Sequence, residues 1–519
     1  MHNYPHYFPR RCGDDRLDVA SVLHAGLLGQ PDRIVLSFDG DAWPAARLCQ
    51  RVAVMQHWLD GQGIVAGNRV AMMLKNSPDH IALIYALILA GVVWVPINTK
   101  LKSTGLQYLM DHCRPELAVL EAEFQPVWTE AAAMARHQCP AVQMPAVDMS
   151  AHAPAMQRVP TSPADILCLI YTSGTTGAPK GVQFTHRMMR IASEAALRVA
   201  DARDGDRLFL WEPLCHIGGA QMLMAPFLVD VQVHVVAAFS ASRFWQQVTT
   251  ARATQLHYLG GILEILLRLP ASTVPPHHNL RVAWGAGLNV QAWDSVRHTL
   301  GVELRECYGM TEGSSFATLN AKGKPGSIGR PLPWISLELL DDKGREVECG
   351  QHGQIVLSSD VEGVFLPAYL DNPEATAQTL RGGRLYTGDY ARRDADGDLY
   401  FVGRGTDSMR VRGENVSAWE VERVMALHPA VESVAAVGVT SDIGEQEILL
   451  YVQFREPSSD AFAELAHWAQ SRLASFQLPR YYRSVERFEL TPSERIRKHL
   501  LSRNLADAWD STRGAAVAA

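Results

Sequence analysis

Apolar and polar residues alternate with two different periods between about Asp32 and Val119. Short apolar runs at Ile34–Phe38 and Arg69–Leu74 are typical of buried β-strands. Ala45–Leu59 and His80–Leu89 instead carry apolar residues at the three- and four-residue spacing of a helix. Strands that alternate with helices predict βαβ units and a parallel sheet. We therefore expect an α/β fold.

The pattern of predicted elements changes beyond Gly326. Short strands such as Leu337–Leu340 and Leu399–Val402 lie between turns rich in Asp and Gly, which predicts a small β-rich subdomain at about 326–403. From residue 404 onward, helices and strands alternate in a compact module. The expected organisation is a large N-terminal domain of αβ-layered sheets at 1–403 and a small, mobile α+β C-terminal domain at 404–519.

Composition narrows the class of protein. The 519 residues are 47% hydrophobic and 20% charged, which describes a folded globular chain of several domains. The net charge of −7 and the lack of a basic tract argue against a nucleic-acid partner. Eight scattered cysteines without a CxxC pair indicate free thiols, and the polar N-terminus lacks a signal-peptide core. The most apolar run, Ile81–Ile97, is interrupted by Gly91 and is short for a membrane span. We expect a cytoplasmic protein.

A glycine-rich loop follows the strand-like run Ile166–Tyr171. It reads TSGTTGAPKG over Thr172–Gly181. Glycine lets the backbone approach a ligand closely, and successive N–H groups and hydroxyls can surround phosphate oxygens. Lys180 would add a positive charge. The spacing differs from the GxxxxGK[ST] phosphate loop because Gly181 and Val182 follow the lysine. Taken alone, such a loop is equally explained as a surface turn.

Three further motifs follow in order. They are YGMTE at Tyr308–Glu312, YTGD at Tyr386–Asp389 with LYFVGR at Leu399–Arg404, and VRGENVS at Val411–Ser417. With the glycine-rich loop, these motifs resemble the ordered signature of the adenylate-forming superfamily. Its members include acyl-CoA synthetases, non-ribosomal adenylation domains and firefly-type luciferases. The resemblance covers nearly the whole chain.

The chemistry of this superfamily suits the residues present. A carboxylate is a poor electrophile, and attack on the α-phosphate of ATP gives an acyl-AMP with AMP as leaving group. The site must hold ATP and Mg²⁺ and neutralise charge at phosphorus. The resemblance implies that Thr311 donates to the α-phosphate and that Glu312 binds Mg²⁺. The other implied ATP-binding residues are the loop Thr172, Ser173, Gly174, Thr175, Thr176 and Lys180, the adenine wall Gly285, Ala286 and Gly287, Tyr308 against adenine, Asp389 at the ribose, and Arg404.

The acid pocket is less clearly marked. His216, in PLCHIGG, resembles an aromatic or histidine gate beside the acyl group, although a loop histidine is often purely structural. Trp211, His257, Tyr258 and Trp284 suggest aromatic and imidazole walls. No acidic residue stands out as a partner for the ammonium of an amino acid, which argues against amino-acid adenylation.

The C-terminal module carries two departures from the family pattern. The resemblance implies rotation about a hinge at Thr406, where relatives usually have Asp or Lys, and places Arg412 and Gly413 near the pantetheine of CoA. The catalytic lysine position of relatives is occupied by Arg495, which keeps the charge in a planar guanidinium. Three outcomes are open: Arg495 substitutes for the lysine, Lys498 reaches the site instead, or adenylation is weak; we expect Arg495 to act.

The leading functional hypothesis is an ATP-dependent acid–CoA ligase. Its partners would be a small carboxylic acid and CoA, with Mg²⁺ as the metal. MRVRGENVSAWEVE looks most similar to crotonobetaine/carnitine-type and related bacterial acyl-CoA ligases. One alternative is loading of a carrier protein, and another is a non-catalytic paralogue that binds nucleotide or acyl-CoA. The resemblance leaves the acid open, and also whether the chain forms a homodimer as many relatives do.

Overall fold

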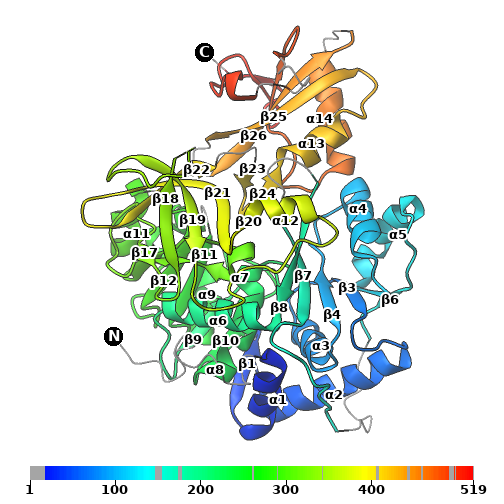
Figure 1. Ribbon diagram of the computed structural model, residues 1–519, viewed down its shortest axis with the longest axis vertical. Coiled ribbons are helices and arrows are strands. Elements are labelled where there is room, and N and C mark those ends of the chain that lie inside the picture. The colour runs from blue at the N-terminus through cyan, green and yellow to red at the C-terminus, as the bar shows by residue number, and fades with distance from the viewer. Residues whose placement is uncertain are drawn as a thin grey trace.

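The chain folds into a large unit and a smaller one. The computed structural model describes residues 18–145, 155–172, 178–259, 262–288, 290–341, 343–404, 408–440, 445–456, 460–489, 496 and 498–517. In Figure 1 the small unit, orange to red, lies above the large one. The large unit ends with β22 (Leu399–Arg404), and the small one begins with β23 (Ser408–Val411). The expected hinge at Thr406 lies outside the described residues.

Two mostly parallel sheets form the frame of the large unit. One has the strand order β6-β5-β3-β4-β7-β8 and the other the order β13-β12-β11-β9-β10-β1-β2. Only the edge pairs β7–β8 and β1–β2 are antiparallel. The first sheet comprises β3 (Arg69–Met73), β4 (Val93–Pro96), β5 (Leu117–Leu120), β6 (Ala141–Gln143), β7 (Ile166–Thr172) and β8 (Lys180–Thr185). The second comprises β1 (Ile34–Phe38), β2 (Asp41–Pro44), β9 (Arg207–Leu210), β10 (Gln232–Val235), β11 (Gln255–Leu259), β12 (Val282–Ala286) and β13 (Glu303–Glu306). The α/β expectation is confirmed.

Helices α3 (Pro78–Leu89) and α6 (His186–Val199) lie between the two sheets. Almost every residue of both helices is buried, as expected of helices that are covered on all sides. They share one apolar cluster with the inner faces of both sheets. Separate clusters cover the outer faces, one with α4 (Ser103–Cys113) and α5 (Gln125–Met134), the other with α9 (Phe244–Ala251), α10 (Ile262–Leu267) and α11 (Trp293–Leu300). The result is a five-layer arrangement.

Helix α6 begins at His186, directly after β8. Phe184 still belongs to β8, and the hydroxyl of Thr185 accepts a hydrogen bond from the backbone N–H of Met188, which starts the helix as an N-cap. The glycine-rich loop therefore joins two antiparallel strands, with Thr172 opposite Lys180.

The β-rich region expected at about 326–403 is present as a separate sheet within the large unit. Its order is β18-β19-β21-β20, and β22 pairs with β21. The strands are β18 (Ser336–Leu340), β19 (His352–Ser358), β20 (Leu380–Arg381) and β21 (Arg384–Arg393).

The small unit is an α+β sandwich. Its sheet has the order β25-β26-β27-β28-β29, comprising β25 (Val431–Thr440), β26 (Gln446–Phe454), β27 (Tyr481–Ser484), β28 (Trp509–Asp510) and β29 (Ala515–Ala516). Helices α13 (Ala418–Met425) and α14 (Ala461–Arg472) pack on one face of this sheet. The hairpin of β23 and β24 (Glu414–Ser417) lies on the side toward the large unit (Figure 1).

Candidate active site

The buried carboxylate of Glu312 connects the glycine-rich loop to the YGMTE motif. Its Oε1 accepts hydrogen bonds from the Thr172 hydroxyl at 3.1 Å and the Tyr369 hydroxyl at 2.8 Å. Thr172 is the last residue of β7, and Glu312 lies in the short 3-10 turn Thr311–Gly313, so residues 140 apart in sequence meet here. Thr311 is buried beside Glu312. The predicted loop residues Ser173, Gly174, Thr175 and Thr176 lie outside the described residues.

Lys180 brings a half-buried cation to the same place. Its Nζ lies 5.0 Å from the centre of the Tyr369 ring, the ring whose hydroxyl binds Glu312. Burial lowers the pKa of Lys180, and the negative charge of Glu312 only partly opposes this shift. An ammonium with incomplete solvation and a nearby carboxylate is well suited to bind a phosphate.

Tyr308 and Asp389 join the YGMTE and YTGD motifs. The Tyr308 hydroxyl donates to Oδ2 of Asp389 at 2.6 Å, and both residues are buried. Asp389 lies on β21 directly opposite Arg404 of β22, so the register of these strands fixes the two predicted residues side by side. Phe401 of β22 stacks on Tyr308 with ring centres 6.0 Å apart.

Replacing Tyr308 by phenylalanine tests this contact. Because Tyr308→Phe removes a hydrogen bond to a buried carboxylate, we expect it to lower the free energy of unfolding by about 1–3 kcal/mol and to raise the KM for ATP. Chemical denaturation and initial-rate kinetics measure the two effects. The matched control is Tyr400→Phe, since the Tyr400 hydroxyl donates to Asp394 at 3.1 Å on the surface of the β-rich sheet. Equal effects of the two substitutions would contradict a special role for Tyr308.

The Gly285–Gly287 turn ends β12 close to its neighbour strand. A Cβ on Gly285 would lie 1.8 Å from the backbone oxygen of Tyr258, so only glycine fits opposite β11. The N–H of Gly287 donates to Oε1 of Glu306 at 2.6 Å, and the Tyr258 hydroxyl donates to its Oε2 at 2.9 Å. Burial raises the pKa of Glu306 to about 7 although these hydrogen bonds oppose the shift. The buried carboxyl thus holds the turn in place.

His216 forms a contact between the two units. Its Nε2 lies 2.7 Å from Oε2 of Glu414, the first residue of β24. Lys100 and Asn98 of the large unit also contact the Glu414 carboxylate, at 3.6 and 3.4 Å. Burial lowers the pKa of His216, but Cys215 and Glu414 outweigh it and raise the pKa well above its ordinary value. The histidine predicted as a gate is therefore bound by the small unit.

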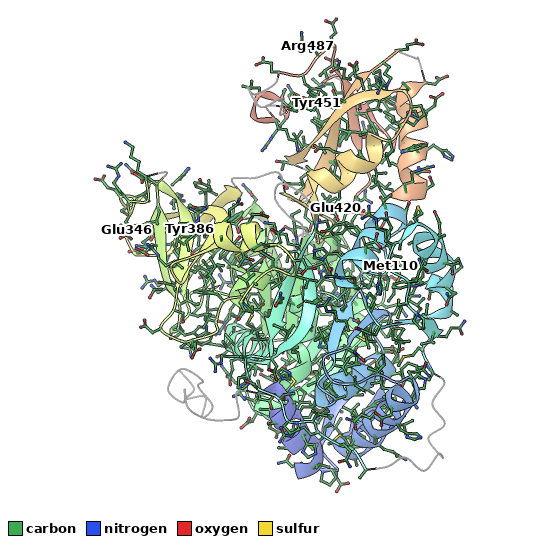
Figure 2. The ribbon with its side chains drawn as sticks, turned by 45° about the vertical axis from the view of Figure 1, so that its right-hand side comes forward. Met110, Glu346, Tyr386, Glu420, Tyr451 and Arg487 are labelled. Atoms are coloured by element: carbon green, nitrogen blue, oxygen red, sulfur yellow. The ribbon has the colours of Figure 1, made fainter. Side chains whose placement is uncertain are left out.

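Arg412 and Gly413 form the turn of the hairpin that carries Glu414. Both have positive φ, 52° and 78°, as a tight two-residue hairpin requires. Nη1 of Arg412 donates to the backbone oxygen of Ser475 at 3.2 Å, so its guanidinium contacts the small unit itself. A crevice at the boundary between the units is lined by Lys102, Thr104, Gly105, Tyr108, Pro179, Glu420, Val424, Arg472, Leu473 and Gln477; Glu420 is labelled there in Figure 2.

The predicted catalytic Arg495 lies outside the described residues, but its neighbours are placed. Ile496 packs in the apolar cluster on the face of the small unit's sheet opposite α13 and α14. Nζ of Lys498 lies 2.7 Å from Oε1 of Glu422, on α13 of the same unit. In this arrangement Lys498 is therefore engaged within the small unit.

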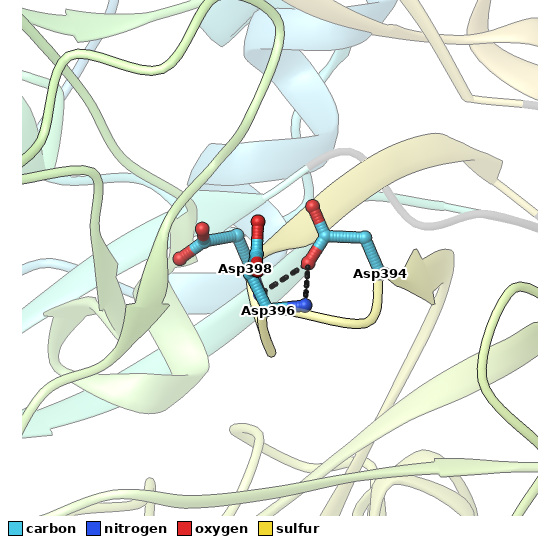
Figure 3. A group of neighbouring side chains, drawn as sticks. All are labelled: Asp394, Asp396 and Asp398. Atoms are coloured by element: carbon cyan, nitrogen blue, oxygen red, sulfur yellow. Dashed lines mark hydrogen bonds between the residues drawn. The ribbon is translucent and has the colours of Figure 1, made fainter.

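A cluster of three aspartates in the turn between β21 and β22 resembles a metal site but has its own cation. Figure 3 shows Asp394, Asp396 and Asp398 converging. Nζ of Lys324 lies 2.6, 3.1 and 3.4 Å from their carboxylates. These hydrogen bonds raise the pKa of Lys324. The lysine ammonium fulfils the role that a metal ion would have, and the cluster is a structural brace of the turn.

Sequence reasoning missed two residues of this region. Tyr369 binds Glu312 but follows no motif, and a tyrosine in an irregular segment is not distinguishable by sequence from a core aromatic. Glu212 lies deeply buried in the loop after β9 beside His257. Its position next to Trp211 in WEPLCH was visible, but only the fold brings it to β11.

The fold and the converging motifs define an adenylate-forming enzyme. The chain belongs to the AMP-binding enzyme family: that family model matches residues 24–366, and the model of the AMP-binding enzyme C-terminal domain matches 420–495. A crotonobetaine/carnitine–CoA ligase of Shigella dysenteriae is 32% identical over 439 residues, 81% of this chain and 85% of the relative. Along the described residues, no helix combines the length and apolar character needed to cross a bilayer.

Solved structures of two other enzymes resemble the chain in fold. A double mutant of o-succinylbenzoate CoA synthetase from Bacillus subtilis, bound with its product analogue, has a TM-score of 0.83 at 24% identity and covers 92% of this chain and 97% of its own. The same synthetase in complex with AMP has a TM-score of only 0.68 at the same coverage. The amide bond synthetase from Marinactinospora thermotolerans has a TM-score of 0.81 at 24% identity, covering 92% and 98%.

Proposed function

We propose that this chain is an AMP-forming acid–CoA ligase. It joins a carboxylic acid to the α-phosphorus of ATP, releases pyrophosphate, and transfers the acyl group from AMP to the thiol of CoA. The observation that carries this proposal is the convergence of Thr172 with Glu312 and of Tyr308 with Asp389 from distant motifs. Membership of the AMP-binding enzyme family and the relative named as a CoA ligase support it.

In the first half-reaction, a carboxylate oxygen bonds to the α-phosphorus while the bond to pyrophosphate breaks. Negative charge develops on the phosphate oxygens, and preorganised donors lower the barrier. Lys180 at the start of β8 and the Thr172 hydroxyl at the end of β7 supply such donors, since the two residues lie opposite each other. Asp389 would accept from the ribose, beside the Tyr308 ring against which adenine would lie.

The donor set at Glu312 fits a magnesium ion. The carboxylate and the neighbouring Thr172 hydroxyl are hard oxygen donors, which Mg²⁺ prefers, and the carboxylate is buried in a preformed position. Glu312 would hold the ion, which when bound would neutralise charge on the phosphate oxygens.

In the second half-reaction, the thiolate of CoA attacks the acyl carbon and the bond to AMP breaks. The arrangement of the two units suits this step, since the hairpin with Arg412, Gly413 and Glu414 faces the large unit at His216. The TM-score is higher to the complex with a product analogue than to the complex with AMP. This difference supports assigning the arrangement of the two units to the second half-reaction. Adenylation would then need rotation near Thr406, which brings Arg495 to the α-phosphate.

A ranking of two variants tests the role of Arg495. We expect Arg495→Ala to suppress acid-dependent exchange of pyrophosphate into ATP far more than Lys498→Ala, because Lys498 is paired with Glu422 in the small unit. The drop expected for Arg495→Ala is about 10²–10³-fold, typical of removing one charge-stabilising donor. The reverse ranking would assign the role to Lys498.

The activity itself is tested with the purified chain and a panel of aliphatic and aromatic acids. Acid-dependent pyrophosphate exchange measures the first half-reaction, and acyl-CoA formation measures the second. We expect both with at least one acid. Exchange without a CoA thioester would favour a carrier protein as acceptor, and nucleotide binding without exchange would favour a non-catalytic paralogue.

A further inference from the structure

A buried acid–base pair lies beside the His216 loop and has no role in the chemistry described above. Glu212, in the loop after β9, and His257, on β11, are only 1% and 3% exposed. Nδ1 of His257 is in direct contact with Oε2 of Glu212. Both line a crevice along β9, β11 and β12, together with Trp211 and Trp284. Glu212 follows the carboxyl end of β9, and this edge of an open α/β sheet is where ligands bind.

The pair is held in a fixed orientation. The His257 ring stacks on Trp284 with centres 4.1 Å apart, and the Trp211 indole donates to the His257 backbone oxygen at 2.7 Å. The buried amide of Asn76 donates to the backbone oxygen of Glu212 at 2.7 Å. A Cβ on Gly218 would lie 2.5 Å from Oε1 of Glu212, so glycine leaves room for the carboxylate. These contacts therefore fix the orientation of the Glu212–His257 pair.

One polar atom on each residue of the pair is left without a hydrogen bond. Oε1 of Glu212 and Nε2 of His257 are buried and have no partner among the residues that the structure describes. In the described arrangement the lining side chains close the crevice, so an acid would enter it only as these side chains move apart. An unpaired buried acceptor costs about 1–3 kcal/mol. A cost of this kind is commonly retained where a ligand supplies the missing partner.

The lining of the crevice restricts what that ligand group can be. Among the described residues around it, none is a lysine or arginine. A second carboxylate on the ligand would therefore meet the charge of Glu212 without compensation. An O–H or N–H group would instead satisfy Oε1 directly, because a carboxylate only accepts hydrogen bonds.

We propose that Glu212 and His257 determine acid specificity, selecting a carboxylic acid whose tail carries a hydrogen-bond donor, a hydroxyl or an amine. This inference rests on the proposed acid–CoA ligase function and names the class of its substrate. The crevice connects to the nucleotide motifs through Phe316, which follows YGMTE and packs edge-on against both His257 and Trp284, at 6.0 and 5.8 Å. The aromatic rings would enclose the apolar part of the acid.

Two matched series of acids test the proposal. Butanoate and benzoate each carry hydroxyl, amino, methyl, carboxylate or trimethylammonium at position 4, and kcat/KM for acyl-CoA formation is measured for each. We expect kcat/KM for the better of the hydroxyl and amino acids to exceed kcat/KM for the methyl acid by at least about 10²-fold. A site built to hydrogen-bond a substrate strongly rejects the analogue that lacks the group. The trimethylammonium arm separates charge from donation: if it equals the amino arm, charge alone selects the acid and the proposal is wrong.

Variants assign the preference to the pair. In Glu212→Met, and in the double variant that adds His257→Phe, we expect the ratio of kcat/KM between the donor-bearing acid and the methyl acid to fall below tenfold. Thermal unfolding verifies that both variants are folded. The control is His234→Phe, which alters a buried histidine of the same sheet that stacks on Phe209 and lies outside the crevice. An unchanged ratio in the Glu212 and His257 variants would overturn the proposal.

A binding measurement separates this proposal from the function on which it rests. Calorimetry of the same acids with wild type and Glu212→Met reports selection even without turnover, and equal affinity for donor and methyl arms overturns the specificity proposal. If all acids of a series form a CoA thioester at equal rates, the ligase function is supported and the specificity proposal is wrong. Donor-selective binding without any exchange or thioester would support the specificity while contradicting the ligase function.

Discussion

Glu312→Gln is expected to lower acid-dependent pyrophosphate exchange by about 10²–10³-fold, the effect of removing one preorganised electrostatic group from such a site. The glutamine keeps the shape of the side chain and can still accept from Thr172 and Tyr369, the two hydroxyls that bind Oε1 at 3.1 and 2.8 Å. Only the negative charge is lost, so the folded structure should persist. The loss should appear as a weaker response to Mg²⁺, because a neutral amide oxygen binds a hard cation less well than a carboxylate.

The measurement is pyrophosphate exchange over a range of Mg²⁺ concentrations, with circular dichroism to verify the fold. Glu338→Gln is the matched control, since Glu338 lies on β18 and pairs with Arg384 in the β-rich sheet. Exchange that remains within a factor of a few of wild type in Glu312→Gln would remove this residue from the catalytic set.

The layered α/β fold could be predicted because its signals are local. The strands at 34–38 and 69–73 follow from short apolar runs, and α3 shows its burial by being apolar on every side. The order of the strands could not be predicted in this way. β1 joins β10 of the second sheet across nearly 200 residues, and no local pattern encodes that pairing.

The residues of the candidate site also divide into those that local motifs predict and those that only the fold reveals. Thr172, Glu312, Tyr308 and Asp389 could be named because each lies in a motif with a recognisable composition. Tyr258 was placed with the aromatic walls of the pocket, but it points to the opposite face of β11 from His257 and binds Glu306. Adjacent residues of a strand face opposite sides, so only one of the two can line the crevice. Glu212 could not be named from the sequence, because its partner His257 is on another strand and only the fold brings the two together.

Glu414→Gln is expected to slow transfer of the acyl group to CoA while leaving acyl-AMP formation nearly intact. In the described arrangement Glu414 joins the small unit to His216 at 2.7 Å, with Lys100 at 3.6 Å. Removing one partner of a fully buried charged contact commonly costs about 2–5 kcal/mol. The His216 side chain is 37% exposed, and solvent screening lowers this cost, so we expect a loss of about tenfold in the second step. The rotation proposed near Thr406 would break this contact, so the first step should not require it.

The same pair gives the second step a pH dependence. Burial raises the pKa of Glu414, but His216 outweighs it and holds that pKa at about 2, below the ordinary 4.5. The attraction due to Glu414 is therefore complete above its ordinary pKa and is lost only as the pH falls toward 2. The pKa of His216 is raised, so its charge is present below 6.5 and is lost as the pH rises through the raised value. We expect thioester formation in the wild type to decline on the alkaline side.

Single-turnover reactions started from the acyl-AMP isolate this step and measure its pH profile. Glu414→Gln should be slow throughout and lose the alkaline decline, because neutral glutamine no longer responds to the charge of His216. Glu432→Gln makes the same chemical change on an exposed part of β25 and should behave as wild type. Equal slowing of exchange and thioester formation in Glu414→Gln would show that the His216 contact serves both steps, and would contradict an arrangement of the two units specific to transfer.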